Sequence, residues 1–124
     1  MVFQSKQIKG NGRGKGIGFP TINLAIPSDF SMDEGIYSAW VIIDGITYKG
    51  ALHYGPVPTF GEKSNQLEVH LVDVGESDIF LEKDTDIEID VVDKLRDIKN
   101  FATTEDLIYQ IDKDVERVRN MLKS

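Results

Sequence analysis

The clearest alternation of apolar and polar positions lies in the middle of the chain. Two runs rich in β-branched and aromatic residues, 36–43 and 46–52, flank the dipeptide Asp44-Gly45. An Asp-Gly pair between two such runs is typical of a two-residue type I′ turn, because both turn residues need positive φ. The pattern therefore predicts an antiparallel β-hairpin over residues 36–52.

Three other segments have the pattern of short strands. Residues 67–72 and 86–91 alternate aliphatic with polar side chains, and residues 19–27 form an apolar run bounded by prolines. In the last segment we expect Pro20 at the start of the strand or on a sheet edge, since proline cannot donate to a ladder. Five or six short strands with tight connections predict a mainly β protein, an antiparallel sheet or barrel.

The end of the chain has helical periodicity instead. Thr103 or Thr104 can cap a helix, and Glu105 and Asp106 would then lie favourably in its first turn. Apolar residues follow on one helical stripe: Leu107, Ile108, Ile111, Val115, Val118 and Leu122. We expect this helix to pack its stripe against the barrel, and the chain to form a single domain, 1–124, without repeats or linkers.

Composition narrows the class of protein. The 124 residues suffice for one core, and 40% hydrophobic residues are ordinary for a folded domain. The chain has no cysteine, which excludes a disulfide framework and a thiol nucleophile. No apolar run approaches the roughly 18 residues of a membrane span, and residues 1–7 do not resemble a signal peptide. We expect a soluble, cytoplasmic monomer without a membrane partner.

The charge is unevenly distributed. The net charge is −7, yet residues 1–28 carry four cations and no acid, against 10 cations and 21 acids in the remainder. The acidic balance disfavours nucleic acid as a partner. One basic, glycine-rich stretch in an acidic protein favours a site for a small anion, and the alternative is a solvated basic tail.

The basic stretch has glycine at every second position from Gly10 to Gly18 and should form a loop. It is no P-loop, because Gly16 follows Lys15 where Ser or Thr is required. It is no dinucleotide fingerprint either, because Pro20 follows and no helix opens there. Successive glycines nevertheless let backbone N–H groups converge on an oxyanion, and Arg13 or Lys15 can add charge.

The segment after the loop carries two oxygen donors. On a strand, Thr21 and Asn23 point to the same face. A hydroxyl and an amide oxygen side by side are ligands that a Mg²⁺ shared with phosphates would accept. The alternative is the ordinary polarity of a strand edge.

The run from Gly10 to Leu24, with its ending G-F-P-T-x-N, resembles the motif of riboflavin kinases, which also form the C-terminal half of bacterial bifunctional FAD synthetases. The resemblance extends over roughly residues 8–122. Its further matches are, in order, Gly35-Ile36-Tyr37, Gly55 with Pro58-Thr59-Phe60, Leu67 to Leu71, Leu95-Arg96 with Lys99 and Phe101, and the helix from about Thr104. The adenylyltransferase half has no counterpart, so FAD synthesis is not implied.

The resemblance implies a six-stranded antiparallel Greek-key β-barrel with a C-terminal α-helix. It implies transfer of the γ-phosphate of ATP to the 5′-hydroxyl of riboflavin, which yields FMN and ADP. Thr21 and Asn23 would share Mg²⁺ with ATP, Glu68 would accept or orient the hydroxyl proton, and Arg96 would lie beside the flavin. The nucleotide would be bound by Gly10, Gly12, Arg13, Gly14, Lys15, Gly16, Gly18, Pro20 and Thr21.

The pattern of residues 67–71 independently allows this role for Glu68. The side chain should point away from the face of Leu67, Val69 and Leu71, and the alternative is an exposed strand carboxylate. His70 falls on the same face as Glu68, and we expect it to be structural.

Several positions depart from the family's usual pattern. His53 stands where Asn is usual, Val57 where Arg is common, and Ile98 where Glu is often found. Ser5 and Gln7 replace the usual Gly and Val. These departures leave open a second hypothesis, a flavin- or nucleotide-binding regulatory module with weak or no catalysis. A third, a nucleic-acid-binding barrel, is disfavoured by the net charge.

Overall fold

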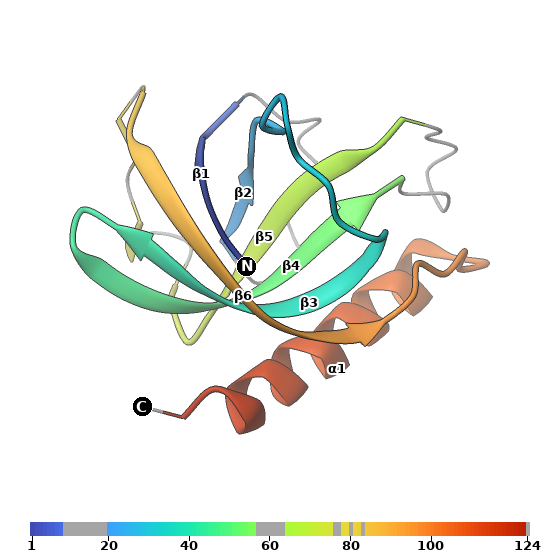
Figure 1. Cartoon of the computed structure of the whole chain (residues 1–124). Coiled ribbons are helices and arrows are strands. Elements are labelled where there is room, and N and C mark those ends of the chain that lie inside the picture. The colour runs from blue at the N-terminus through green and yellow to red at the C-terminus, as the bar shows by residue number, and fades with distance from the viewer. Residues whose placement is uncertain (9–19, 57–63, 76–77, 80, 83, 124) are drawn as a thin grey trace.

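A computed structural model describes residues 1–8, 20–56, 64–75, 78–79, 81–82 and 84–123. This part of the chain forms six strands followed by one helix (Figure 1). In chain order they are β1 (Val2–Lys6), β2 (Thr21–Asn23), β3 (Gly35–Ile43), β4 (Ile46–Gly55), β5 (Gln66–Val72), β6 (Asp86–Arg96) and α1 (Thr104–Met121).

The strands form one antiparallel sheet in the order β1-β6-β3-β4-β5-β2. Because β3, β4 and β5 follow one another and β6 returns beside β3, these four strands form a Greek key. The two edge strands meet at one end, where Gln7 bridges Leu24 and the Ile8 N–H donates to the Asn23 carbonyl at 2.8 Å. The sheet thus curls into a partly closed barrel, and the predicted mainly β fold is confirmed.

The predicted hairpin is confirmed at its turn. Asp44 and Gly45 have φ of 50° and 79°, as a type I′ turn requires. The second strand continues to Gly55, three residues beyond its predicted end at Leu52.

Other strands differ from the sequence pattern. The apolar run 19–27 was expected to be a strand, but β2 covers only Thr21–Asn23, with a bridge at Leu24. β1 was not predicted, because its residues Val2–Lys6 are mostly polar and owe their conformation to pairing with β6. β6 continues to Arg96, beyond the alternating segment 86–91, with two register shifts against β3.

The two faces of the sheet bury different apolar clusters. The inner cluster fills the barrel, and its members are Ile22, Leu24, Tyr37, Ala39, Val41, Ile43, Leu52, Leu67, Val69, Leu71, Ile87 and Ile89. The outer cluster joins the sheet to the helix and consists of Ile36, Ala51, Val72, Leu95, Ile111, Val115, Val118 and Leu122.

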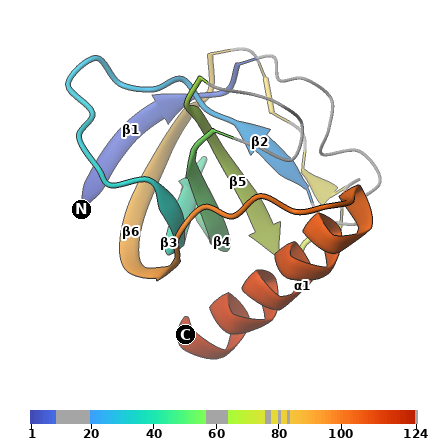
Figure 2. The same cartoon turned by 90° about the vertical axis from the view of Figure 1, so that its right-hand side faces the viewer.

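Helix α1 covers the outer face of β3, β4 and β5, and runs diagonally beneath the sheet (Figures 1 and 2). Thr103 is its N-cap, as expected, and its side chain accepts a hydrogen bond of 3.1 Å from the Asp106 N–H. Ile111, Val115, Val118 and Leu122 of the predicted stripe are buried, whereas Leu107 and Ile108 are only half-buried. The described helix is too polar to cross a membrane.

Candidate active site

Four polar side chains meet where β2 pairs with β5. In this register Thr21 lies opposite His70, and Asn23 lies opposite Glu68. Directly opposed residues of an antiparallel pair share a face, so the four side chains form one group, here called the polar quartet. Thr21 and Asn23 therefore share a face, as the sequence predicted, and Glu68 is brought beside them.

The alternation of β2 and β5 keeps the quartet apart from the barrel core. Ile22 and its partner Val69 lie between the two polar pairs and are buried in the inner cluster. The ladder continues beyond both ends of β2: the Leu24 N–H donates to the Leu67 carbonyl at 2.8 Å, and the Leu71 N–H donates to the Pro20 carbonyl at 2.9 Å. Pro20 thus serves as an acceptor just before the edge strand, where its missing N–H costs no ladder bond.

His70 is hydrogen-bonded within the quartet. Its Nδ1 lies 2.9 Å from the Thr21 Oγ1, and the residue is only 8% exposed. The pKa of His70 is lowered to about 4, mainly because the ring is buried and also because His53 is nearby, while Asp114 opposes the shift. His70 is therefore neutral at pH 7.

Glu68 has a second polar neighbour on β4. His53 lies directly opposite it there, so Glu68 stands between Asn23 and His53 across three strands. The His53 Nε2 is 3.0 Å from the Gly55 carbonyl oxygen. Since a carbonyl can only accept, Nε2 carries the hydrogen in this bond. His53, at the position where the family usually has Asn, thus adds an ionisable group beside the predicted base.

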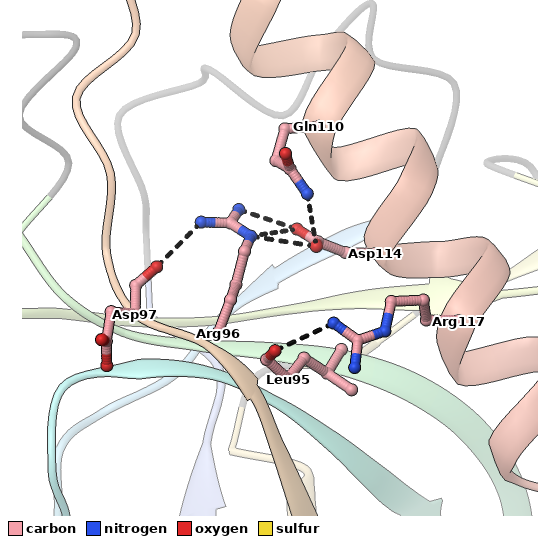
Figure 3. Close-up of polar contacts among 6 residues, drawn as sticks. All are labelled: Leu95, Arg96, Asp97, Gln110, Asp114 and Arg117. Carbon is pink, nitrogen blue, oxygen red and sulfur yellow. Dashed lines mark hydrogen bonds and ion pairs between the residues drawn. The ribbon is translucent and has the colours of Figure 1, made fainter.

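Arg96 is tied to helix α1 (Figure 3). Its Nε donates to both Asp114 carboxylate oxygens at 3.0 and 3.1 Å, and its Nη2 donates to Oδ2 at 2.7 Å. Its Nη1 donates to the Asp97 carbonyl at 3.1 Å, and the Gln110 Nε2 donates to Asp114 Oδ1 at 3.1 Å. The Phe101 ring centroid lies 5.8 Å from the guanidinium carbon. Arg96 therefore has a clear structural function besides its predicted flavin contact.

The sequence analysis did not identify Asp114, the buried partner of Arg96. It is 2% exposed and sits within the apolar stripe of α1, three residues after Ile111 and next to Val115. An acid in the buried stripe of a helix needs a partner, since an unpaired charge is costly to bury. The acidic residue in an apolar stripe was visible in the sequence. Its partner, Arg96, is determined only by how the helix docks on the sheet.

Arg96 and the quartet lie on the same face of the sheet. The register pairs Arg96 with Ile36, Ile36 with His53, and His53 with Glu68. Three strand spacings of about 4.8 Å put the backbones of Arg96 and Glu68 about 14 Å apart along this row. The predicted flavin residue and the predicted base are thus neighbours in one row rather than in direct contact.

Some of the remaining residues singled out in the sequence lie in the described part of the chain, and others do not. The nucleotide loop Gly10–Gly18 and the departure at Val57 lie outside the described residues. Of the other departures, Ile98 packs against the outer apolar cluster, and the buried Ser5 donates its hydroxyl to the Ala25 carbonyl at 2.5 Å. These two side chains have packing and hydrogen-bonding roles of their own.

Comparison with known proteins connects this geometry to a family. A family model described as riboflavin kinase matches residues 1–122. The bifunctional riboflavin kinase/FMN adenylyltransferase of Haemophilus influenzae is 32% identical over 118 residues, which cover 94% of this chain and 37% of that protein. The riboflavin kinase of Mus musculus is 30% identical over 123 residues, which cover 93% of this chain and 76% of that protein. The chain thus spans little more than a third of the length of the bifunctional relative.

A solved structure shares the fold. The crystal structure of a protein titled macrolide-efflux protein, from Streptococcus pneumoniae, aligns with a TM-score of 0.81 and 25% identity. The alignment covers 98% of this chain and 39% of that chain. The likeness supports the arrangement of six strands and one helix.

Proposed function

This chain belongs to the riboflavin kinase family, and we propose that it transfers the γ-phosphate of ATP to the 5′-hydroxyl of riboflavin, giving FMN and ADP. The observation that carries the proposal is the β2–β5 register, which sets Thr21 and Asn23 beside Glu68 on one face. A phosphoryl transfer needs positioning and charge neutralisation more than covalent chemistry. Two oxygen ligands, a glycine-rich loop and one carboxylate can meet that need.

The donor set of β2 fits Mg²⁺. Thr21 and Asn23 offer a hydroxyl and an amide oxygen from half-buried positions on one face. Among the described residues, no group of three or more His, Cys, Asp or Glu could bind a metal by itself. Mg²⁺ usually keeps waters and substrate phosphate oxygens and takes few protein ligands, so a two-residue site suits it. The bound ion would neutralise the charge of the ATP phosphates.

Glu68 is the proposed group for the acceptor hydroxyl. Its Cβ should lie about 5 Å from that of Asn23, as for any directly opposed pair, so it is close to the phosphate end of the site. From this position the carboxylate accepts a hydrogen bond from the 5′-hydroxyl and orients the oxygen toward the γ-phosphate. Because the transition state is loose, the proton is needed late, and orientation is the larger contribution.

Arg96 is the proposed contact for the flavin ring. It lies in the same row as Glu68, at a distance that a tricyclic ring and its ribityl chain can span. Of its five N–H donors, three make the bonds to Asp114 and Asp97 found in the described part of the chain. The other two can donate to flavin carbonyl oxygens, and the buried ion pair holds the guanidinium in place for this contact.

The decisive experiment is to incubate the purified protein with riboflavin, ATP and Mg²⁺ and to separate FMN by chromatography. We expect FMN with the wild type, and almost none with EDTA or with Thr21→Ala or Asn23→Ala, whose ligand oxygens are lost. If both variants form FMN at the wild-type rate, the activity comes from a contaminating kinase. Thr21 and Asn23 would then no longer be assigned as the metal site.

A second candidate function is a flavin- or nucleotide-binding module without catalysis, which the ionisable His53 beside Glu68 favours. Riboflavin and Mg·ADP binding without any FMN formation would support this alternative. Cytoplasmic location and a monomeric state remain predictions, as does the lack of a nucleic-acid partner. Gel filtration tests the oligomeric state.

A further inference from the structure

We propose that His70 is a positioning residue for Thr21. In this interpretation the His70 Nδ1 accepts the hydroxyl hydrogen of Thr21, so that the lone pairs of Oγ1 point toward the cation and the nucleotide phosphates. The inference rests on the proposed function, which makes Thr21 a ligand, and it gives a chemical task to a side chain that the sequence had marked as structural.

The hydrogen bond sets the direction of the Thr21 hydroxyl. A hydroxyl has one hydrogen and two lone pairs, and a cation ligand must present a lone pair to the metal. The hydrogen must then go to an acceptor on the other side of the oxygen. The His70 Nδ1, 2.9 Å from Oγ1, is in the position to accept it.

The burial of His70 agrees with the acceptor role. The residue is only 8% exposed, and a neutral imidazole has one ring nitrogen without a hydrogen that can accept. A charged imidazolium would donate at Nδ1, occupy a lone pair of Thr21 and place a positive charge beside the cation site. The neutral ring with its hydrogen on Nε2 avoids both effects.

The backbone around the pair is anchored in the barrel core. Ile22 and Val69, which follow and precede the two residues, are both buried in the inner cluster. On its other side His70 lies opposite Ala51 of β4, whose methyl group offers no competing hydrogen bond. Within the sheet, His70 therefore has an apolar neighbour on one side and the Thr21 hydroxyl on the other. Partners of this kind behind a metal ligand typically change metal affinity by 10–100-fold when they are removed.

The test is a double-mutant cycle read by nucleotide binding. The variants are His70→Leu, which fills a similar volume without an acceptor, Thr21→Val, which removes the hydroxyl at constant shape, and their combination. The measured quantity is the ratio of the ADP dissociation constants in EDTA and in Mg²⁺, obtained by calorimetry. His70→Asn is the matched control, because its amide oxygen can take the place of Nδ1.

We expect the Mg²⁺ enhancement of ADP binding to fall about 10-fold in His70→Leu, with ADP binding in EDTA unchanged. The double variant should lose no more than Thr21→Val alone, because both changes act through one ligand. His70→Asn should recover most of the enhancement. Riboflavin affinity should stay at the wild-type value in all of them.

Two outcomes would overturn the inference. An unchanged Mg²⁺ enhancement in His70→Leu would make His70 a packing residue, and additive losses in the double variant would mean that it acts independently of Thr21. The proposed function is judged separately by FMN formation in the wild type. If wild-type ADP binding shows no Mg²⁺ enhancement, the metal site at Thr21 and the role of His70 both fail.

Discussion

Replacing Asp114 with Asn would test the buried ion pair that joins helix α1 to the sheet. The Asp114 carboxylate accepts three bonds from Arg96 and one from Gln110, and its side chain is 3% exposed against 11% for Arg96. An amide keeps the shape of the carboxylate. It removes the negative charge, however, and turns an N–H₂ group toward one of the donors.

The structure sets the size of the effect. A buried charge that loses its partner typically costs 3–5 kcal/mol of unfolding free energy, because the guanidinium is then desolvated without compensation. For a domain of this length we expect the melting temperature to fall by about 10 °C or more. The expected loss of unfolding free energy is a large share of the roughly 5–15 kcal/mol that is the total stability of a typical domain.

The assay is urea and thermal unfolding followed by circular dichroism. The matched control is Asp73→Asn, since Asp73 pairs with Arg119 at 2.7 Å but on the surface, with side-chain exposures of 52% and 39%. Asn tolerates the positive φ of 62° at position 73, so only the ion pair changes there. We expect a loss under about 1 kcal/mol in the control.

A double replacement separates charge from packing. Arg96→Met combined with Asp114→Leu exchanges the pair for apolar side chains and should recover most of the stability lost in Asp114→Asn. If Asp114→Asn costs no more than Asp73→Asn, the pair does not tie the helix to the sheet. That result would refute the structural role assigned here to Arg96.

Three further predictions concern the polar quartet, the nucleotide loop and the loss of folding stability at acidic pH. Glu68→Gln should lower kcat by about 10²-fold, the low end for a general base, with riboflavin affinity nearly unchanged in a fluorescence titration; turnover within threefold of wild type in a folded variant would exclude Glu68 as the base. Mg·ADP should protect the amides of residues 10–18 from hydrogen exchange if they cradle the phosphates, and unchanged exchange would refute that role. The pKa of His70 is lowered to about 4 in the folded protein, mainly by burial, so below pH 6.5 the unfolded chain binds more protons than the folded one. The free energy of unfolding of the metal-free protein should therefore fall by roughly 3 kcal/mol between pH 6.5 and 4. The measurement is a melting curve at pH 7 and at pH 4.5 for the wild type and for His70→Asn. The variant should not show this loss, and an equal loss in His70→Asn would mean that another group causes it.

The sequence alone determined the features that depend on neighbours along the chain. The Asp44-Gly45 turn and the Thr103 cap follow from backbone preferences over a few residues, so both could be predicted in place. The alternation of β5 likewise showed which side chains point into the core. These local rules also put Thr21 and Asn23 on one face before their partners were known.

Tertiary structure decided the pairings between distant residues. His70 and Thr21 are 49 positions apart, and their contact depends on the register of β2 against β5, which the inner cluster selects as a whole. The mostly polar β1 becomes a strand only because β6 offers it a free edge. Arg96 finds Asp114 because the outer cluster docks the helix at one position on the sheet. A residue's own sequence neighbourhood specifies its preferred backbone and its face, but a partner in a distant segment is specified only by the packing of all segments together.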